Sequence, residues 1–536
     1  MMEKEVDVLI VGSGPTGLLA AHALTKQNIN VIIIEKKQTP SPLSKALAIH
    51  ARTMETFDLL GIVDPFLEKG CKATGAHIHL GNKEPFTVHF SSLKSAFPYI
   101  FVLPQAETEK ILERELPYKV ARGTELISIK QHYNYVSCLL QGSEATSVKA
   151  RYVLACDGAH SSVRRFLGVP FRGENEGITF FLGDVTLEGM KEEKRANLYV
   201  NERGIAFIVP ISRNVTRVIV ADFLKQNESH TRELSLDELK ESVNRLISTP
   251  LSLHNPVWLS RFGTSHKQVP SYQQDHVFFV GDAVHIHNPA GGRGMNIGLQ
   301  DAMNISWKLS FVLRGFSPPS LLRSYDEERR PIGKSVLQST SFLIKSVTSQ
   351  NKFFSSLRNT LAPKLIEKDF IATKILERLS NIGFHYKKSH LSKKMQSQYL
   401  QTTGLKSGER IQDFTFYNHE GEWRLYELLR TQTFISLFYL DSLQESDKVL
   451  IDRFHKVLNV HYPKAVNPFV VLGKAPELCS LPCLVDHDQT LRKNIHMSHK
   501  DVLLLRPDGY VAFHQKELNI QEVIHKLSYW LLSKKG

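Results

Sequence analysis

The stretch VDVLIVGSGPTGLLAAHAL, residues Val6–Leu24, joins an apolar run to a glycine-rich turn and then to a run rich in alanine and leucine. The apolar part predicts a buried strand, Val6–Val11, and the last part predicts a helix. The glycines are spaced G-x-G-x-x-G, which suits a sharp turn, a close approach of the backbone to a pyrophosphate, and tight packing of helix on strand. We therefore expect a Rossmann-type α/β unit that binds a dinucleotide. The residues expected to hold it are Gly12, Gly14, Pro15, Thr16 and Gly17.

An acidic residue follows at the distance that such units require. INVIIIEKK (Ile29–Lys37) predicts a second buried strand ending at Glu35, eighteen residues after Gly17. A carboxylate there can accept hydrogen bonds from ribose hydroxyls, and it favours an unphosphorylated ribose, as in FAD or NAD. We expect Glu35 and the adjoining Lys36 to bind the adenosine half of the dinucleotide. A glycine turn without a ligand would leave an acid at the end of an apolar strand unexplained.

Two later segments repeat this arrangement of a strand followed by an acid. In RYVLACDGAHSSVRRFLG (Arg151–Gly168), Asp157 and Gly158 follow an apolar strand, and Arg164 lies at the start of a helix. Asp157 has a simpler explanation as the cap of that helix, and the two roles can coexist.

In DHVFFVGDAVHIHNPAGGRGMNIG (Asp275–Gly298), a strand runs into Asp282, and a glycine-rich loop precedes a helix expected to begin near Asn296–Gly298. Asp282 can bind a ribityl or ribose hydroxyl, and the glycines leave room for a flat ring to approach the backbone. A helix N-terminus aimed at reduced flavin would stabilise its negative charge by about 0.3–2 kcal/mol. The expected ligand-binding residues are Gly281, Asp282, Pro289, Gly292, Gly294, Met295 and Asn296; those expected to form one apolar helix face are Ala302, Ile305, Leu309 and Val312, with Gly315 as the stop.

Taken together, these motifs resemble a known family. G-x-G-x-x-G, D-G-x-x-S-x-x-R and G-D-A-x-H-x-x-x-P, in that order, are the fingerprints of class A flavoprotein aromatic hydroxylases, the para-hydroxybenzoate and phenol hydroxylase family. Residues 1–345 carry the resemblance. It also implies contacts to FAD from Arg52, in ALAIHARTMETFDLLGI (Ala46–Ile62), and from Gln105, in VLPQAETEKILEREL (Val102–Leu116).

The resemblance implies a mechanism as well. NADPH or NADH reduces FAD, reduced flavin reacts with O2 to give a C4a-hydroperoxide, and one oxygen passes to an electron-rich aromatic carbon. It implies that Pro289, Gly292 and Gly294 flank the reacting part of the flavin. It also links the Asp157/Arg164 motif to both FAD and the nicotinamide cofactor, which would dock only transiently.

His285 and His287 are candidates for bases that deprotonate a phenol. We favour structural roles, with His285 packed near the pyrophosphate and His287 bonded within its loop, because the family has the first histidine whatever its substrate.

The remaining chain predicts two further units. Residues 171–270 resemble an antiparallel substrate-binding sheet with one inserted helix, which divides the FAD-binding domain into 1–170 and 271–345. Phe180, Phe181 and Phe207 could line its pocket, but aromatic strand residues are more often core. Residues 346–403 predict a helical segment and linker.

Residues 404–536 resemble a thioredoxin-like α/β domain, with a hairpin at Asp508-Gly509. The loop after its first strand, DSLQES, lacks the Cys-x-x-Cys of a working thioredoxin. Cys479 and Cys483, in CSLPC, have another spacing and come late. We therefore expect no dithiol chemistry from this domain, and a packing or homodimerising role.

Composition restricts the functional class. The net charge of +13 is spread among 54 acidic residues, which favours a solvated surface and anionic cofactors over nucleic acid. Five scattered cysteines argue against a disulfide framework. The N-terminus lacks a signal-peptide layout, and no apolar run reaches the roughly 18 residues of a membrane span. We expect a cytoplasmic protein without a metal site.

Three alternatives stay open. A flavin halogenase should carry a Trp-x-Trp-x-Ile-Pro segment, but the four tryptophans here are isolated from one another. A non-catalytic dinucleotide-fold binding protein would have no reason to keep Asp157, Arg164 and Asp282 together. A monooxygenase that acts on a polycyclic antibiotic or polyketide, of tetracycline or rifamycin type, would carry the same three motifs. The thioredoxin-like tail favours simple phenols over these.

Overall fold

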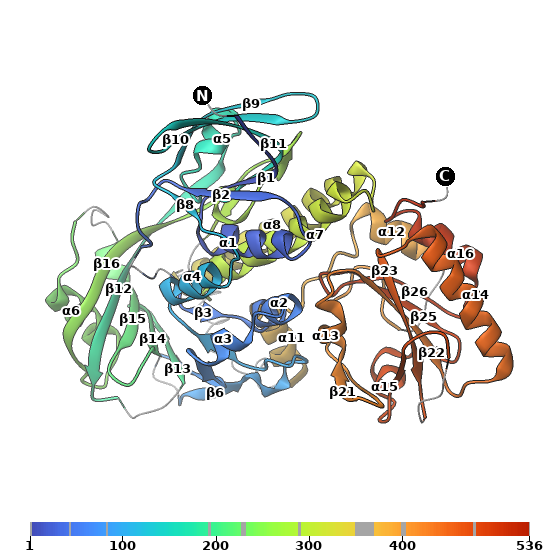
Figure 1. Cartoon of the computed structure of the whole chain (residues 1–536). Helices are drawn as coiled ribbons and strands as arrows, with labels where there is room; N and C mark the ends of the chain where they lie inside the picture. The colour runs from blue at the N-terminus through green and yellow to red at the C-terminus, as the bar shows by residue number, and fades with distance from the viewer. Residues whose placement is uncertain are drawn as a thin grey trace.

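A computed structural model describes residues 3–41, 44, 46–81, 84–190, 195–226, 232–287, 291–348, 369–397, 404–474 and 479–534. Pro289, expected beside the flavin, lies outside these described residues. The model contains three large sheets and one small sheet, and its helices pack between and around them (Figure 1).

The first sheet confirms the expected Rossmann-type unit. Its central strands are parallel because each is followed by a crossover rather than a tight turn. Two strands, β9 (Glu125–Gln131) and β10 (Val136–Gln141), extend it as an antiparallel ribbon on β11. The main strands, in spatial order, are β17 (Gln273–Gln274), β18 (Val277–Phe279), β11 (Ala145–Ala155), β1 (Glu3–Val11), β2 (Val31–Glu35) and β8 (Ala121–Arg122).

A three-stranded sheet, β3 (Ala48–Ile49), β7 (Ile100–Val102) and β4 (Cys71–Ala73), links the first sheet to the second. Helix α2 (Ala51–Leu60) packs against β7, while α1 (Pro15–Thr25) lies against β1 and β2 of the first sheet; α3 (Asp64–Leu67) and α4 (Gln105–Arg114) lie near them (Figure 1).

The second sheet is largely the antiparallel one that was expected, but it also takes strands from outside residues 171–270. The strands β5 (Gly75–Leu80) and β6 (Phe86–His89) join one edge, and β5 pairs parallel to β13. That pairing joins residues more than a hundred positions apart, so no local pattern could have indicated it. The order is β19 (His285–Ile286), β16 (Ser252–Gln268), β12 (Arg172–Glu188), β15 (Thr216–Asp222), β14 (Gly204–Pro210), β13 (Ala196–Asn201), β5 and β6.

Helix α6 (Leu236–Leu246) covers one face of this sheet. Ser235 caps it by accepting a hydrogen bond from the backbone N–H of Glu238. Leu239, Val243 and Leu246 recur at helical spacing and are buried against the sheet.

Helix α7 (Gly294–Leu313) differs from the expectation in two ways. It begins at Gly294, about two residues earlier than expected, and it is buried on every side rather than along one apolar face. Its end is as expected, since Gly315 follows in the left-handed conformation. Helices α8 (Ser324–Thr348), α11 (Asp369–Leu379) and α12 (His390–Ser397) continue the chain, and α5 (Ser162–Phe166) follows β11.

The C-terminal residues form the third large sheet, with the α/β organisation and the hairpin at Asp508-Gly509 that the sequence predicted. Strands β22, β23 and β24 are parallel, and β25 is antiparallel to β22. The spatial order is β21 (Gly421–Arg424), β20 (Thr415–Asn418), β24 (Cys483–Val485), β23 (Val466–Leu472), β22 (Phe434–Leu440), β25 (Val502–Leu505) and β26 (Val511–Gln515); the helices are α13 (Leu425–Leu429), α14 (Glu445–His461), α15 (Thr490–Ile495) and α16 (Ile520–Leu527). Its likeness to thioredoxin stays a prediction.

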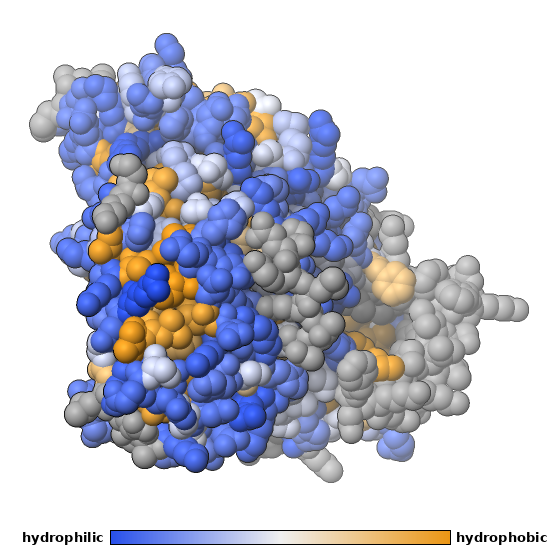
Figure 2. Space-filling view, turned by 90° about the vertical axis from the view of Figure 1, so that its right-hand side faces the viewer, coloured by the Kyte–Doolittle hydropathy of each residue, from blue (hydrophilic) through white to orange (hydrophobic). Residues whose placement is uncertain are grey.

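The first and third sheets share one continuous hydrophobic core, which runs from β1 through α7 to α16. The face on the right of Figure 1 is mostly hydrophilic, with a broad hydrophobic area (Figure 2). Among the described residues, no helix combines the length and apolar character that crossing a bilayer needs.

Candidate functional site

The carboxyl ends of four parallel strands meet at one edge of the first sheet. Gly12 follows β1, Glu35 ends β2, Asp157 comes two residues after β11, and Asp282 comes three residues after β18. Ligands of open parallel sheets bind at this edge. The three sequence motifs therefore converge on one place, although they lie more than a hundred residues apart.

The first glycine turn leaves open space where a phosphate would approach. Gly12 has φ of +103°, and a Cβ on it would lie 2.5 Å from the carbonyl oxygen of Cys156. A Cβ on Gly17 would clash with the carbonyl oxygen of Gly12, so helix α1 packs as closely as expected. A Cβ on Gly14 would meet no atom within 4 Å. Because Gly14 caps α1 and Pro15 starts it, free backbone N–H groups of the first turn lie beside that space.

Glu35 lies next to this turn. One carboxylate oxygen accepts a hydrogen bond from the backbone N–H of Ser13 at 3.1 Å, and the other accepts one from that of Lys37 at 3.1 Å. These bonds fix the carboxylate where a ribose would pass the end of β2. Lys36 is exposed.

The two oxygens of the Asp157 carboxylate differ in their hydrogen bonding. Its Oδ2 accepts hydrogen bonds from the hydroxyl of Ser162 at 3.0 Å and the backbone N–H of Val163 at 3.1 Å, so Asp157 binds the first turn of α5, although the N-cap residue of that helix is Ser161. Within the part of the chain that the structure describes, its Oδ1 is buried without a hydrogen-bond partner. A buried acceptor of this kind calls for a donor, and a cofactor hydroxyl or N–H would supply it. The adjacent Gly158 has φ of +77° and open space where a Cβ would be.

Arg164 fastens the second motif to the third. Its guanidinium donates to the carbonyl oxygen of Ala283 at 2.9 Å and to that of Ala159 at 2.7 Å. It also stacks over the ring of Phe171, 3.9 Å from the centroid. Arg164 is 7% exposed. Its two hydrogen bonds hold the loop after β11 against the loop after β18.

Close packing ties the third motif to the first. A Cβ on Gly281 would lie 2.8 Å from Thr16 Oγ1, and one on Gly298 would lie 2.7 Å from the same atom. Thr16 therefore brings α1, the loop after β18 and the start of α7 together. Asp282 lies between two buried residues and is itself exposed, in the loop that follows β18 at this edge of the sheet.

The start of α7 is held by the side chain of Asn296, and its expected contact to the flavin stays a prediction. Its side-chain oxygen accepts from the backbone N–H of His50 and the hydroxyl of Thr53, both at 2.8 Å, and its amide donates to the carbonyl oxygens of Ala48 and Gly292 at 2.8 Å. The side chain is fully used and buried, so only its backbone can face a ligand. Met295 packs partly against the core.

Gly292 and Gly294 lie directly before and at the start of α7. Gly292 has φ of +60°, and a Cβ on it would lie 3.1 Å from the Cβ of Ala48. A Cβ on Gly294 would lie 3.8 Å from Nε2 of the half-buried His287. This 20-residue helix thus begins just after Gly291 and Gly292, with Arg293 as its N-cap residue.

His285 takes a structural role, but through a contact that we did not expect. It is buried, and its Nε2 lies 2.8 Å from a carboxylate oxygen of Asp301, whose other oxygen accepts from Arg329 at 2.6 Å. A base that deprotonates a substrate must reach it, and this ring faces the protein interior.

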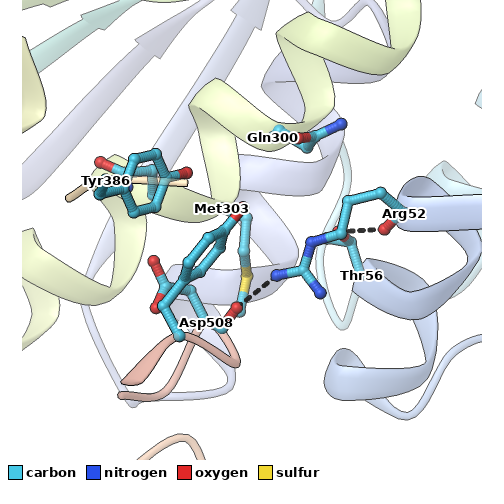
Figure 3. Close-up of a pocket in the computed structure, with 8 residues that line it drawn as sticks. Arg52, Thr56, Gln300, Met303, Tyr386 and Asp508 are labelled. Atoms are coloured by element: carbon cyan, nitrogen blue, oxygen red, sulfur yellow. Dashed lines mark hydrogen bonds between the residues drawn. The ribbon is translucent and has the colours of Figure 1, made fainter. Parts of the chain in front are cut away.

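Arg52 is not at the cofactor edge, contrary to the expectation. Its guanidinium donates to Glu55 at 2.9 Å and to the carbonyl oxygen of Asp508 at 2.5 Å, and 2% of the residue is exposed (Figure 3). Figure 3 shows it directed towards the Asp508 turn of the C-terminal sheet, beside Met303 of α7. A buried guanidinium with these partners cannot contact the flavin.

Gln105 lies at the start of α4. Its side chain accepts from the backbone N–H of Ala46 at 3.2 Å and donates to Glu109 at 2.8 Å. Its contact to FAD stays a prediction.

The substrate sheet has one face under α6 and one half-open face. Phe181 is core beneath α6, and Phe180 stacks on Phe262 with centroids 5.7 Å apart, which supports the core interpretation for both. On the other face, Leu198, Phe207 and Ile219 lie opposite one another on three neighbouring strands and are all half-buried. We call these three residues the apolar row. Phe207 packs near Leu47, which precedes the Ala48 that approaches Gly292.

A buried ionic network on α7 escaped the sequence analysis. Lys308 donates to Glu328 and to Asn304, each at 2.8 Å, and Arg506 of the C-terminal sheet donates to both oxygens of Glu328 at 2.7 and 2.9 Å. Burial alone would raise the pKa of Glu328, but Arg506 and Lys308 hold it at about 2. The signal was present as a polar stripe, because Asp301, Asn304 and Lys308 recur at helical spacing.

Comparisons with known proteins agree with this site. A family model described as "FAD binding domain" (FAD_binding_3) matches residues 5–340. An uncharacterized aromatic compound monooxygenase, YhjG, of Bacillus subtilis (strain 168) is 30% identical over 99% of this chain and 99% of its own length. A rifampicin monooxygenase of Streptomyces venezuelae is 33% identical over 71% of this chain and 79% of its own.

Among solved structures, OxyS anhydrotetracycline hydroxylase from Streptomyces rimosus aligns with a TM-score of 0.77 and 25% identity, over 98% of this chain and 99% of its own. The match to an FAD-binding family covers the segments that converge at the sheet edge, and a monooxygenase matches from end to end. This chain therefore belongs to the class A flavoprotein aromatic hydroxylases.

Proposed function

We propose that this protein is an FAD- and NAD(P)H-dependent monooxygenase that inserts one oxygen atom of O2 into a phenolic aromatic ring. The observation that carries the proposal is the convergence of Gly14, Glu35, Asp157 and Asp282 at one edge of the first sheet. Family membership supplies FAD; the electron donor, the oxygen chemistry and the substrate are what we add.

The residues present fit FAD. The open space at Gly14 and the first turn of α1 suit the pyrophosphate, and Glu35 suits the adenosine ribose. Asp282 is exposed and would bind the ribityl chain, while the unpartnered Oδ1 of Asp157 would accept a hydrogen bond from the same cofactor. When bound, FAD supplies the redox chemistry that activates O2.

The protein's own contribution near the ring is electrostatic. The backbone N–H groups of Gly294 and Met295 open α7, whose dipole favours negative charge at that end. Asn296 fixes this helix start through four hydrogen bonds, so the donors are preorganised before charge develops. Gly292 and Gly294 keep side chains away from the ring, the role that we also propose for Pro289.

We propose that the apolar row lines the substrate side. Its three side chains lie on the face that meets Leu47, next to the loop that opens α7, and they would exclude water from the reacting face of the flavin. A flat apolar wall suits an aromatic ring of either substrate class.

The size of that aromatic substrate is a second question. The tail was expected to favour simple phenols, yet OxyS anhydrotetracycline hydroxylase aligns over 98% of this chain, tail included. The tail therefore does not separate the classes. A polycyclic polyketide or antibiotic is the second candidate, favoured by the names of OxyS and the rifampicin monooxygenase.

We also propose domain boundaries, a cellular location and a role for the C-terminal domain. The FAD-binding domain comprises residues 1–170 and 271–345, the substrate domain 171–270, and the thioredoxin-like domain 404–536, after the segment 346–403. The protein acts in the cytoplasm, and the C-terminal domain supports packing or a homodimer. Val449 of α14 and Leu532, 71% and 46% exposed, would be candidates for such a contact.

The test is a screen for substrate-dependent NAD(P)H oxidation with phenols and with tetracycline- and rifamycin-type compounds. The proposal expects at least one aromatic compound to accelerate oxidation and to gain one oxygen by mass. Acceleration with peroxide release but no oxygenated product from any compound would contradict it. The class of the active compound decides between the two candidates.

A further inference from the structure

Two cysteines of the C-terminal sheet lie side by side. The Sγ atoms of Cys479 and Cys483 are 2.8 Å apart, within about 0.8 Å of the length of a disulfide bond. The chain brings them together through a tight turn at residues 480–482, in which Leu481 is buried and its carbonyl oxygen accepts from Cys479 Sγ at 3.1 Å. A separation of four positions is therefore no obstacle to pairing.

The surroundings favour reactivity of this pair over the other cysteines. Both sulfur atoms belong to half-buried residues, so a small oxidant can reach them. The hydrogen bond from Cys483 lowers the pKa of Cys479 to about 7, against the opposing effect of burial, and the backbone of Leu481 acts in the same direction as Cys483. Thiolate is the nucleophilic form.

The remaining three cysteines differ in kind. Cys138 and Cys156 are buried, and burial raises the pKa of Cys138 to about 12. Cys71 is exposed, on β4 of the three-stranded sheet. Cys71, Cys138 and Cys156 therefore serve as an internal comparison for the oxidation of Cys479 and Cys483.

We propose that Cys479 and Cys483 form a reversible redox pair that closes an intramolecular disulfide when the protein meets hydrogen peroxide. The Cys479 thiolate attacks one peroxide oxygen and becomes a sulfenic acid, and the second oxygen leaves as hydroxide, which takes up a proton to become water. The Cys483 sulfur then attacks the sulfenic sulfur, releasing the second water. Two thiols are oxidised by two electrons, and one peroxide is reduced to two waters.

This inference reverses the expectation of no dithiol chemistry and does not depend on the proposed function. That expectation rested on the loop after β22, where a working thioredoxin has its cysteines, and that loop indeed lacks them. The pair lies instead at the start of β24, where Cys483 pairs with Val470 of β23. The disulfide would fix the turn that leads into this strand.

The test uses the full-length flavoprotein. Its cysteine thiols are first reduced, the reductant is removed, and the protein is then exposed to equimolar hydrogen peroxide. We expect a mass lower by about 2 Da, a peptide linking residues 479 and 483, and three of the five thiols left for titration after denaturation. A dithiol reductant should restore all five. Five titratable thiols after treatment, or a cross-link elsewhere, would overturn the proposal.

Variants distinguish the pair from a single reactive thiol. With oxidised glutathione, Cys483→Ser should trap one glutathione on Cys479, whereas wild type should pass through that adduct to the disulfide. Cys71→Ser serves as the control and should close the disulfide as wild type does. Loss of the disulfide in Cys71→Ser, or a stable adduct on Cys479 in wild type, would count against the pair.

Discussion

Asp282 is an exposed carboxylate between buried neighbours, at the end of a strand that leads to the flavin loop. We predict that Asp282→Ala weakens FAD binding about 10- to 150-fold, because a hydrogen bond to a charged group is worth about 1.5–3 kcal/mol. The ratio of flavin to protein absorbance after gel filtration, and titration with FAD, measure this.

Asp237→Ala is the matched control, since that carboxylate is 91% exposed on α6, on the far side of the substrate sheet. It should purify with full flavin. If Asp282→Ala keeps the wild-type FAD affinity, the role given to this carboxylate is wrong.

Phe207 carries the proposed substrate contact at the centre of the apolar row. We predict that Phe207→Ala raises KM for the aromatic substrate about 5- to 150-fold, since losing part of an apolar pocket costs about 1–3 kcal/mol. FAD affinity should not change, because the residue lies on the substrate sheet. Steady-state kinetics with the compound found in the screen provides the measurement.

Ile208→Ala, the next residue along β14, is the control for Phe207. Its side chain is buried on the opposite face, under α6, so the change should lower stability while leaving KM near the wild-type value. An unchanged KM in Phe207→Ala would remove this residue from the substrate side.

At the scale of elements, the buried network holds α7, α8 and the C-terminal sheet together through Glu328, Lys308 and Arg506. We predict that Glu328→Gln lowers the free energy of unfolding by about 3–5 kcal/mol, because the buried Lys308 loses its counter-ion and Arg506 keeps only Asp508 as a carboxylate partner. Thermal unfolding followed by intrinsic fluorescence measures the loss. Glu445→Gln, at a side chain that is 88% exposed, should have little effect.

The same carboxylate gives a pH dependence. Its pKa in the folded protein, about 2, lies below the ordinary 4.5, so its stabilising contribution is complete above pH 4.5 and is lost as pH falls towards 2. The midpoint difference between wild type and Glu328→Gln should shrink as the pH falls below about 4.5. A difference that stays constant down to pH 3 would contradict this assignment.

The elements that the sequence predicted well are those whose signals are local. The strand, glycine turn and helix at Val6–Leu24 need only neighbouring residues to be recognised, and so does the helix stop at Gly315. The parallel pairing of β5 with β13 and the partners of Arg52 depend on residues far away in the chain. The resemblance to the family implied that Arg52 contacts FAD. Its guanidinium is instead held by the carbonyl oxygen of Asp508, 456 residues later in the chain.

For the candidate site, the sequence predicted that three motifs converge at one sheet edge, but not how each of their residues is used. Asp157, Arg164 and Asn296 all lie at the carboxyl edge of the first sheet. The side chains of Arg164 and Asn296, however, form hydrogen bonds to other parts of the protein. Hydrogen-bond partners such as Ala283 and His50 come from other segments, so spacing within a motif cannot reveal them. Glycines were easier to interpret, because a missing side chain acts through the space it leaves.

At the scale of the whole molecule, the third sheet and the flavin-binding part share one hydrophobic core. Trp307 of α7 donates to Asp508 at 3.1 Å, and Arg506 reaches Glu328 of α8. Arg506 also donates to both carboxylate oxygens of Asp508, at 3.0 and 2.6 Å. We expect Asp508→Ala to lower the thermal midpoint of the entire protein in one transition, since Arg506 loses one of its two carboxylate partners and the indole N–H of Trp307 loses its acceptor. Two separate transitions, with the flavin signal unchanged in the first, would show that the units unfold independently.

The central claim is that these parts assemble around FAD to place oxygen from O2 on an aromatic ring. The most direct measurement is a single turnover of the reduced flavoprotein with a substrate from the screen under heavy-isotope O2. The account predicts one labelled oxygen atom in the product and reoxidised FAD. A product without label, or a pure protein that is colourless and takes up no added FAD, would contradict it.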